Sequence, residues 1–183
     1  MKSSMLTVLL SIFFVTLAKS QKKEDKITLT PTEIQSLMLV KDEMEIRALA
    51  DKFSDAANRK DGAAFQSLWA KDGVWKIGPP INMEFKGKEN MGISVTHMLG
   101  LWDFFVQMNG PGVIEVNGNK ATARFYVNEI ARKTDDKSGN YNLSQYADEL
   151  IKEDGKWVFL KRTYNTIYQE APNYKGLVQS LPK

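Results

Sequence analysis

The second half of the chain carries four β-type segments joined by short turns, and this pattern restricts the fold more than any other part of the sequence. Aromatic and β-branched residues are frequent in each segment. Asn117-Gly118 separates the first pair and Asp154-Gly155 separates the last pair. Such steps are typical of hairpin turns, so the sheet should be antiparallel. The segments are residues 113–116, 121–132, 141–151 and 157–168.

A long helix is predicted well before these strands. Thr30 can act as its N-cap, Pro31 occupies the first helical position, and Glu33 is placed to complete a capping box. Apolar residues then recur at close to helical spacing as far as Asn58. The sequence therefore predicts a first helix over residues 31–58.

Two shorter helices and two short strands are predicted between this helix and the β-rich half. Asp61 can cap a second helix that ends near Trp69. Residues 74–77 and 83–85 are typical of a short hairpin. Apolar spacing then predicts a third helix over residues 88–108. Helices followed by an antiparallel meander indicate an α+β fold, with the helices over one face of a curved sheet.

The first twenty residues form a separate unit. Lys2 is followed by an apolar run from Met5 to Leu17, and small residues precede the step between Ser20 and Gln21. This pattern is typical of a secretory signal peptide, and the run is shorter than the about 20 residues that span a bilayer. We expect an exported protein, with a retained anchor as the alternative. The predicted domain organisation is a signal peptide at 1–20, a linker at 21–30, one domain at 31–170 and a tail at 171–183.

Composition excludes several classes of site. The chain contains no cysteine, which excludes thiol nucleophiles, thiolate metal sites and disulfides. His97 is the only histidine, so a zinc site built from several histidines is excluded as well. The formal charge of +3 would fall to +1 without Lys2 and Lys19, and a nearly neutral chain is a poor partner for nucleic acid. We expect no cofactor, no metal, no nucleic-acid partner and, once the signal peptide is removed, no membrane partner.

A series of short motifs gives the chain a family resemblance. In order, they are Ile46–Phe53, Lys60-Asp61-Gly62, Leu68-Trp69, Asp72–Trp75, Phe85–Asn90, Val116–Arg124, Tyr146–Leu150 and Asp154–Trp157. Each motif by itself consists only of turn-forming residues and alternating apolar residues. Their order and spacing over residues 42–168, however, resemble a SnoaL-like domain of the NTF2-like superfamily. The resemblance extends to the scytalone dehydratase and ketosteroid isomerase type of cone.

The resemblance implies a cone-shaped, strongly bent antiparallel sheet wrapped around three N-terminal helices, also described as a cystatin-like α+β barrel. It also implies an apolar pocket at the wide end and a homodimer formed through the outer face of the sheet. Members include dehydratases, isomerases, cyclases and epoxide hydrolases, as well as proteins of no known activity. The fold alone therefore does not decide the function.

The resemblance also indicates where catalytic groups would lie. Where dehydratase-like members carry a tyrosine and an aspartate at the end of the first helix, this chain has Ala57 and Asn58, and an amide cannot act as a general base. Asn58 is expected at the pocket rim. A histidine expected before the strand at 113–116 is replaced by the stretch around Gln107, and His97 lies earlier on the predicted third helix. Ser144 matches a pocket serine of the dehydratases.

Acidic residues are the remaining candidates for proton transfer. Asp148 and Glu149 have opposite orientations on one strand, so only one of them can face the interior. Glu129 and Asp103 are further candidates, although charged residues are usually exposed. Asn58, His97, Ser144 and Asp148 are thus the weak catalytic candidates.

Aromatic residues could line the pocket, because ligand cavities are largely apolar with a few polar groups. The alternative is that these residues belong to an ordinary core or to an oligomer interface. The predicted pocket residues are Asn58, Trp75, Trp102, Phe105, Phe125 and Tyr146.

Three functions agree with the sequence. The first is binding of a small hydrophobic molecule without proven catalysis, favoured by the absence of the family's acid and histidine. The second is a lyase, isomerase or cyclase that acts on a cyclic hydrophobic substrate by general acid/base chemistry. The third is a secreted interaction domain, which a large exposed apolar patch would favour. The first two differ in whether a carboxyl group or the imidazole faces the cavity.

Overall fold

The computed structural model describes residues 28–179. The predicted signal peptide, residues 1–20, and most of the predicted linker lie outside the described residues. The described residues form three helices, α1 (Pro31–Asn58), α2 (Gly62–Ser67) and α3 (Lys88–Gly100). They also form six strands, β1 (Trp69–Ile77), β2 (Met83–Lys86), β3 (Trp102–Asn117), β4 (Lys120–Lys133), β5 (Gly139–Glu153) and β6 (Lys156–Glu170). No helix in this part of the chain is long and apolar enough to cross a membrane.

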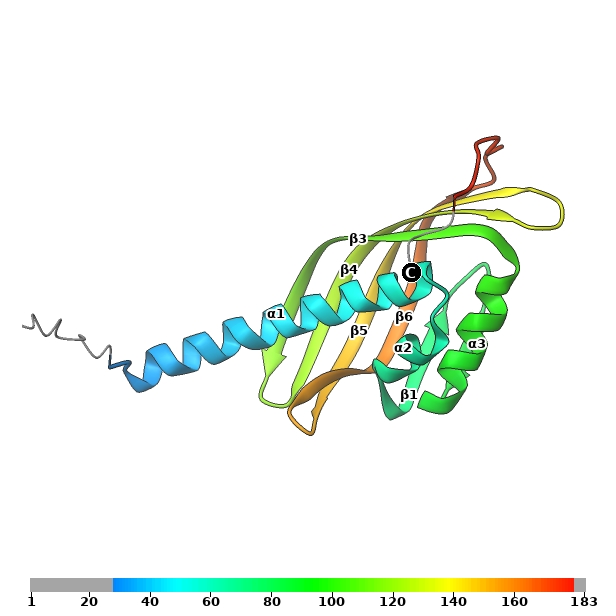
Figure 1. The fold of residues 1–183 in the computed structure, drawn as a ribbon. Helices are drawn as coiled ribbons and strands as arrows, with labels where there is room; N and C mark the ends of the chain where they lie inside the picture. The colour runs from blue at the N-terminus through cyan, green and yellow to red at the C-terminus, as the bar shows by residue number, and fades with distance from the viewer. Residues whose placement is uncertain (1–27, 180–183) are drawn as a thin grey trace, which may run out of the picture.

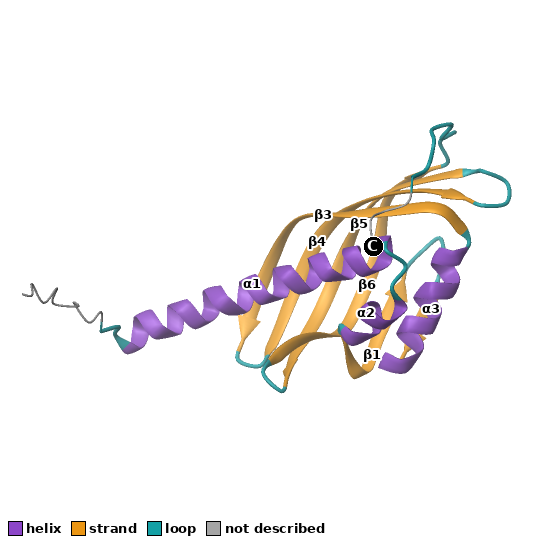
Figure 2. Ribbon diagram, viewed as in Figure 1, coloured by secondary structure: helices purple, strands orange, loops and turns teal. Residues whose placement is uncertain are grey.

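The strands form one curved sheet in the order β2-β1-β6-β5-β4-β3. α1 lies across its concave face, while α2 and α3 lie together near β1 (Figure 1). All three helices are on the same side of the sheet, and the convex side carries none of them (Figure 2). The predicted α+β architecture, a bent sheet wrapped around three helices, is confirmed.

The local signals for the first two helices are confirmed. The Thr30 hydroxyl accepts a hydrogen bond from the Glu33 backbone N–H at 3.3 Å, and the Glu33 carboxylate accepts one from the Thr30 N–H at 2.8 Å. This reciprocal capping box fixes the start of α1. The Asp61 carboxylate accepts from the Ala64 N–H at 2.9 Å and caps α2.

The core lies between α1 and the concave face of the sheet. Ile46 and Phe53 of α1 are 0% and 1% exposed, and the Phe53 ring packs 4.7 Å from Phe65 of α2 and 5.3 Å from Tyr146 of β5. The side of α1 that follows the helical repeat from Ile46 is therefore the side the sheet buries. Its buried apolar residues are Ile46, Leu49, Ala50, Phe53, Ala56 and Ala57.

The predicted third helix is too long. α3 ends at Gly100, and the residues from Trp102 onward continue directly into β3. Aromatic and β-branched residues are frequent in this stretch, and pairing with β4 supplies the backbone hydrogen bonds that a helix would otherwise provide. Phe105 is buried, whereas Phe104 is only half-buried and packs 5.9 Å from the Tyr174 ring of the C-terminal segment.

The first strand also differs from the prediction. Trp69 begins β1 rather than ending α2, so the strand starts five residues before the predicted 74–77 segment, and Gly73 lies inside it at a shift in pairing register. β1 pairs with β6 in parallel, while the other neighbouring strands are antiparallel as predicted. The parallel pair is possible because the long connection from β1 to β6 contains α3 and three strands of the meander.

A buried ion pair lies among the aromatic residues of the core. Asp148 of β5 is directly opposite Arg162 of β6, with Arg162 Nε 3.4 Å from Asp148 Oδ1, and both side chains are fully buried. The guanidinium lies 3.8 Å from the Tyr146 ring centroid and 4.2 Å from that of Phe53. Burial raises the pKa of Asp148 to about 6, although Arg162 opposes the effect. Burial lowers the pKa of the Arg162 guanidinium.

Removing one member of this ion pair should destabilise the fold, whereas replacing both members with apolar residues should destabilise it much less. Asp148→Asn leaves the Arg162 charge buried without an anion, and we expect it to reduce the free energy of unfolding at pH 7 by about 3–5 kcal/mol. The double variant Asp148→Leu/Arg162→Met buries no charge and should recover most of that loss. Urea unfolding of the three proteins tests this. A double variant as unstable as Asp148→Asn would contradict it.

Candidate functional site

A cavity of about 420 Å³ lies between α1, α3 and the concave face of the sheet. Its walls are mainly apolar and aromatic, and the exposed residues that border it come from the β1–β2 connection, the end of β4 and the end of β6. A size and lining of this kind are typical of small-molecule pockets. The principal lining residues are Phe53, Ala57, Phe65, Trp75, Ile77, Val95, Met98, Leu99, Trp102, Phe105, Gln107, Glu129, Asn142, Tyr146 and Tyr164.

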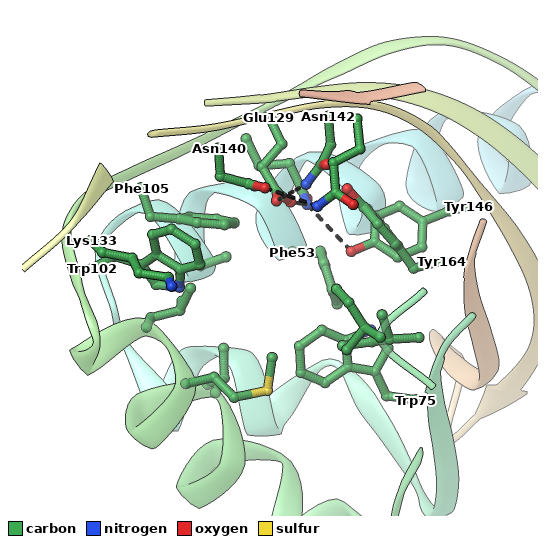
Figure 3. Close-up of a pocket in the computed structure, with 18 of the residues that line it drawn as sticks. Phe53, Trp75, Trp102, Phe105, Glu129, Lys133, Asn140, Asn142, Tyr146 and Tyr164 are labelled. Carbon is green, nitrogen blue, oxygen red and sulfur yellow. Dashed lines mark hydrogen bonds between the residues drawn. The ribbon is translucent and has the colours of Figure 1, made fainter. Parts of the chain in front are cut away.

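Three polar side chains form a row across one wall of the cavity. Gln107 of β3 is paired with Glu129 of β4, and Glu129 is paired with Asn142 of β5. The strand register therefore places all three on the concave face, where they are 3%, 9% and 2% exposed. Figure 3 shows Glu129 and Asn142 close together, with Tyr146 and Tyr164 beside them and Trp75 farther along the cavity.

Both oxygens of the Glu129 carboxyl group are held by amides. Gln107 Nε2 donates to Oε2 at 3.1 Å, and Asn142 Nδ2 donates to Oε1 at 2.9 Å. Burial raises the pKa of Glu129 above its ordinary value, and its contacts with Asn142, Gln107 and Tyr164 only partly oppose this effect. Glu129 is thus a carboxyl group in an apolar cavity that can hold a proton at a higher pH than a solvated glutamate.

Polar groups beside Glu129 remain available to a ligand. Gln107 Nε2 also donates to the Tyr146 hydroxyl at 3.3 Å. Among the described residues, the Tyr164 hydroxyl and Asn142 Oδ1 have no hydrogen-bond partner, although both atoms are buried. A hydroxyl can donate and accept, and an amide oxygen accepts, so a ligand that carries a hydroxyl or carbonyl group could satisfy both. Burial raises the pKa of both tyrosines, which keeps them neutral.

Asn58, at the end of α1, holds the β3 part of this wall in place. Its Nδ2 donates to the Gln107 carbonyl at 2.9 Å, and its Oδ1 accepts from the Gln107 N–H at 2.7 Å. The Ser54 hydroxyl, one turn earlier on α1, donates to Gln107 Oε1 at 3.0 Å. The end of α1 therefore holds both the backbone and the side chain of Gln107, and Gln107 in turn holds Glu129.

The predicted pocket residues fall into two groups. Trp75, Trp102, Phe105 and Tyr146 line the cavity. Asn58 and Phe125 are not among its lining residues in the described part of the chain: Asn58 bonds to the β3 backbone, and Phe125 packs under β3, where a side chain at Gly112 would strike its ring.

The weak catalytic candidates also lie outside the described cavity lining. His97 is exposed on α3. Ser144 and Asp148 are buried on the concave face, but Asp148 faces Arg162 rather than the cavity. Asp103, which was considered together with Glu129, is not among the described cavity-lining residues and forms ion pairs with Arg132 at 2.7 Å and Lys137 at 3.2 Å.

Glu129 was considered from the sequence as an acid for proton transfer, but it was not included among the four catalytic candidates. Ala123, Phe125 and Val127 alternate along one buried face of β4, and continuing the same alternation by two residues reaches Glu129. The general tendency of charged residues to be exposed outweighed that signal. Gln107 was missed because its segment was assigned to the third helix, where strand alternation does not apply.

The described residues offer no cluster of three or more acidic or histidine side chains arranged to hold a metal ion. The polar side chains that line the cavity are one carboxyl group, four amides, two phenols, one serine and one lysine, a set that suits hydrogen bonding to an organic ligand better than metal coordination.

Solved structures with a similar fold come from several bacteria. The hexachlorocyclohexane dehydrochlorinase LinA-type3 from Novosphingobium barchaimii matches with a TM-score of 0.68 and 18% identity, over 80% of this chain and 99% of that one. An NTF2-like protein with a cystatin-like fold from Novosphingobium aromaticivorans gives 0.64 and 21%, over 75% and 90%. The protein Rv3472 from Mycobacterium tuberculosis, of unknown function, gives 0.62 and 18%, over 76% and 78%.

The family is shown at the sequence level. No curated protein matches the chain. The model of the SnoaL-like domain family matches residues 39–163, which is well over half of the sequence. That range contains α1 from its middle onward and most of the sheet, including Gln107, Glu129 and Asn142. The fold is similar to that of a solved NTF2-like protein, and the family match over residues 39–163 shows that the chain belongs to the SnoaL-like domain family.

Proposed function

We propose that this protein binds a small, largely apolar ring molecule in the cavity between α1, α3 and the sheet. The observation that carries the proposal is a mainly apolar chamber of about 420 Å³ in which the buried polar side chains of Gln107, Glu129 and Asn142 form a row on one wall. Burial of the ligand's rings against Trp75 and Phe105 would supply most of the affinity. Glu129, Asn142 and Tyr164 would orient a single hydroxyl or carbonyl group.

A side chain that fills the cavity should abolish binding. Ala57 is 4% exposed and lines the cavity from α1, so Ala57→Phe places a ring where the ligand would lie. We expect the affinity for 2-tetralone, a bicyclic ketone, to fall at least about tenfold, equivalent to about 1.4 kcal/mol. Quenching of tryptophan fluorescence measures binding, because Trp75 and Trp102 line the cavity.

His97→Ala is the matched control, because His97 is exposed and outside the cavity lining. Circular dichroism should show that Ala57→Phe remains folded, since overpacking costs about 1–3 kcal/mol. Equal affinity of Ala57→Phe and the wild type would place any ligand elsewhere.

A second candidate function is proton transfer to and from a cyclic hydrophobic substrate, as in a lyase or isomerase. The observation that favours it is the carboxyl group of Glu129, buried on the cavity wall and fixed by Gln107 and Asn142. Its raised pKa brings the carboxyl closer to the range in which a group can both accept and return a proton. A dehydrochlorinase among the proteins of similar fold, which also removes a proton, supports the same chemistry.

Deuterium exchange tests this function without knowledge of the natural substrate. In D2O the Glu129 carboxylate would take a proton from the carbon beside the carbonyl of 2-tetralone, the carboxyl proton would exchange with solvent for a deuteron, and the carboxyl would then give that deuteron to the enolate. We expect Glu129→Gln to reduce the exchange rate by about 10²-fold or more while binding persists. The wild-type rate should rise with pH through a midpoint above 4.5, because only the ionised carboxyl is a base.

Proton NMR of the ketone measures the exchange, and His97→Ala should exchange at the wild-type rate. Wild-type binding without any exchange would leave the protein as a binding module. Exchange that survives in Glu129→Gln would assign the base to another group.

A further inference from the structure

The N-terminal half of α1 is unusually apolar for an exposed helix. It extends past the edge of the sheet, where no other described element covers it (Figure 1). Within eleven residues it exposes six large apolar side chains, between 44% and 65% of each. They are Ile34, Leu37, Met38, Leu39, Val40 and Met44. The same helix beyond Ile46 buries its apolar residues, so the exposed set is not explained by packing within the described chain.

Four of these residues form a stripe on the side of α1 that faces away from the sheet. Ile34, Leu37, Val40 and Met44 follow one another at steps of three and four, the spacing that places side chains on one helix face. Ile46 lies nine positions after Leu37, and nine residues at about 100° each make half a turn beyond two full turns. Because Ile46 points into the core, Leu37 points directly away from it.

The convex face of the sheet, expected from the family resemblance to form the dimer, is less suited to self-association. On β4 that face exposes Thr122, Arg124, Tyr126 and Asn128 in succession, so polar and charged residues separate its one large aromatic side chain from others along the strand. Met108 and Val113 of β3 are exposed on the same face, but along β4 the large apolar side chains are sparser than along the stripe on α1. Large exposed apolar patches of this kind mark interaction sites.

We propose that the stripe is a homodimer interface, in which two copies of α1 pack antiparallel with the two-fold axis at Leu37. In this arrangement a residue before Leu37 meets the residue equally far after it in the second copy. Leu37 contacts Leu37 of the second copy. Ile34 of each copy contacts Val40 of the other, so this contact occurs twice. Three of the four stripe residues are thus placed against apolar residues of the other copy, while Met44, seven positions after Leu37, lies opposite Thr30 at the helix start.

Charge complementarity selects this register and a second copy as the occupant. Glu33 and Lys41 lie equally far from Leu37 on opposite sides, so the axis brings each Glu33 beside a Lys41 of the second copy. Both bonds that Glu33 makes at the cap use Oε2, which leaves Oε1 to face Lys41. Lys41 is 69% exposed and lies 3.4 Å from Glu45 of its own helix, and its flexible side chain can reach either partner.

A lipid surface fits the stripe less well. Residues 31–45 contain four acidic side chains and one lysine, whereas helices that lie on membranes are rich in lysine and arginine. The protruding part of α1 is only about 22 Å long at 1.5 Å per residue, so the dimer should bury a small interface and depend on concentration.

Disulfide trapping tests the register directly, because the chain has no cysteine of its own. Leu37→Cys places one thiol at the axis, where two copies bring their thiols together. We expect mild oxidation to convert it to a covalent dimer. Met38→Cys, on a neighbouring side of the same helix, and Ile93→Cys, an exposed apolar position of α3, should stay largely monomeric. All three positions are exposed, so each variant should fold.

Sedimentation velocity over a wide concentration range provides the second measurement. The wild type should shift from monomer to dimer with concentration, and Leu37→Glu should lose the dimer while Ile93→Glu keeps it. A monomer at every concentration would overturn the proposal. So would a dimer in which Leu37→Cys crosslinks no faster than Ile93→Cys. Binding of a monomeric wild type to phosphatidylglycerol vesicles, lost in Leu37→Glu, would identify a lipid surface as the occupant instead.

Discussion

The fold depends on burying one face of α1 in the concave side of a bent sheet. Phe53 and Ala57 fill part of that concavity. In the strands that face them, every second side chain points inward and either contacts α1 or borders the cavity that the helix does not fill. The cavity is that remaining space, because α3 closes the sheet from the other end without reaching α1 along its whole length. The site is thus a consequence of how helix and sheet pack.

The same packing determines the chemistry at the cavity wall. Asn58 holds the backbone of Gln107, Gln107 and Asn142 hold Glu129, and the carboxyl group is left facing an apolar space. The tyrosine and aspartate that the resemblance would place at the end of α1 are absent, and the amide found there has a supporting role toward β3. A carboxyl group on β4 therefore takes the place of an acid at the end of α1 as the titratable group of the site. This arrangement is compatible with binding alone or with proton transfer.

Sequence patterns predicted the parts of the structure that local chemistry determines. The capping box at Thr30, the Asp61 cap and the hairpin turns at Gly118 and Gly155 each specify a conformation within a few residues. Parts that depend on distant pairing were predicted less well. The stretch from Trp102 to Gln107 has apolar residues at spacings that suit a helix, and only its partner β4 makes it a strand. Glu129 has the alternation of an inward residue, but its burial becomes evident only with Gln107 and Asn142 beside it, and those residues come from two other strands.

The central claim is that the Glu129 carboxyl group lies in an apolar cavity that makes it harder to ionise. Carbon-13 NMR of the side-chain carboxyl groups, with Glu129→Gln to assign the signal, measures its titration in the folded protein. The account predicts a midpoint clearly above 4.5, because burial outweighs the two amide hydrogen bonds. A midpoint at or below 4.5 would mean that Glu129 is solvated or more strongly stabilised as an anion, and it would contradict the site described for this cavity.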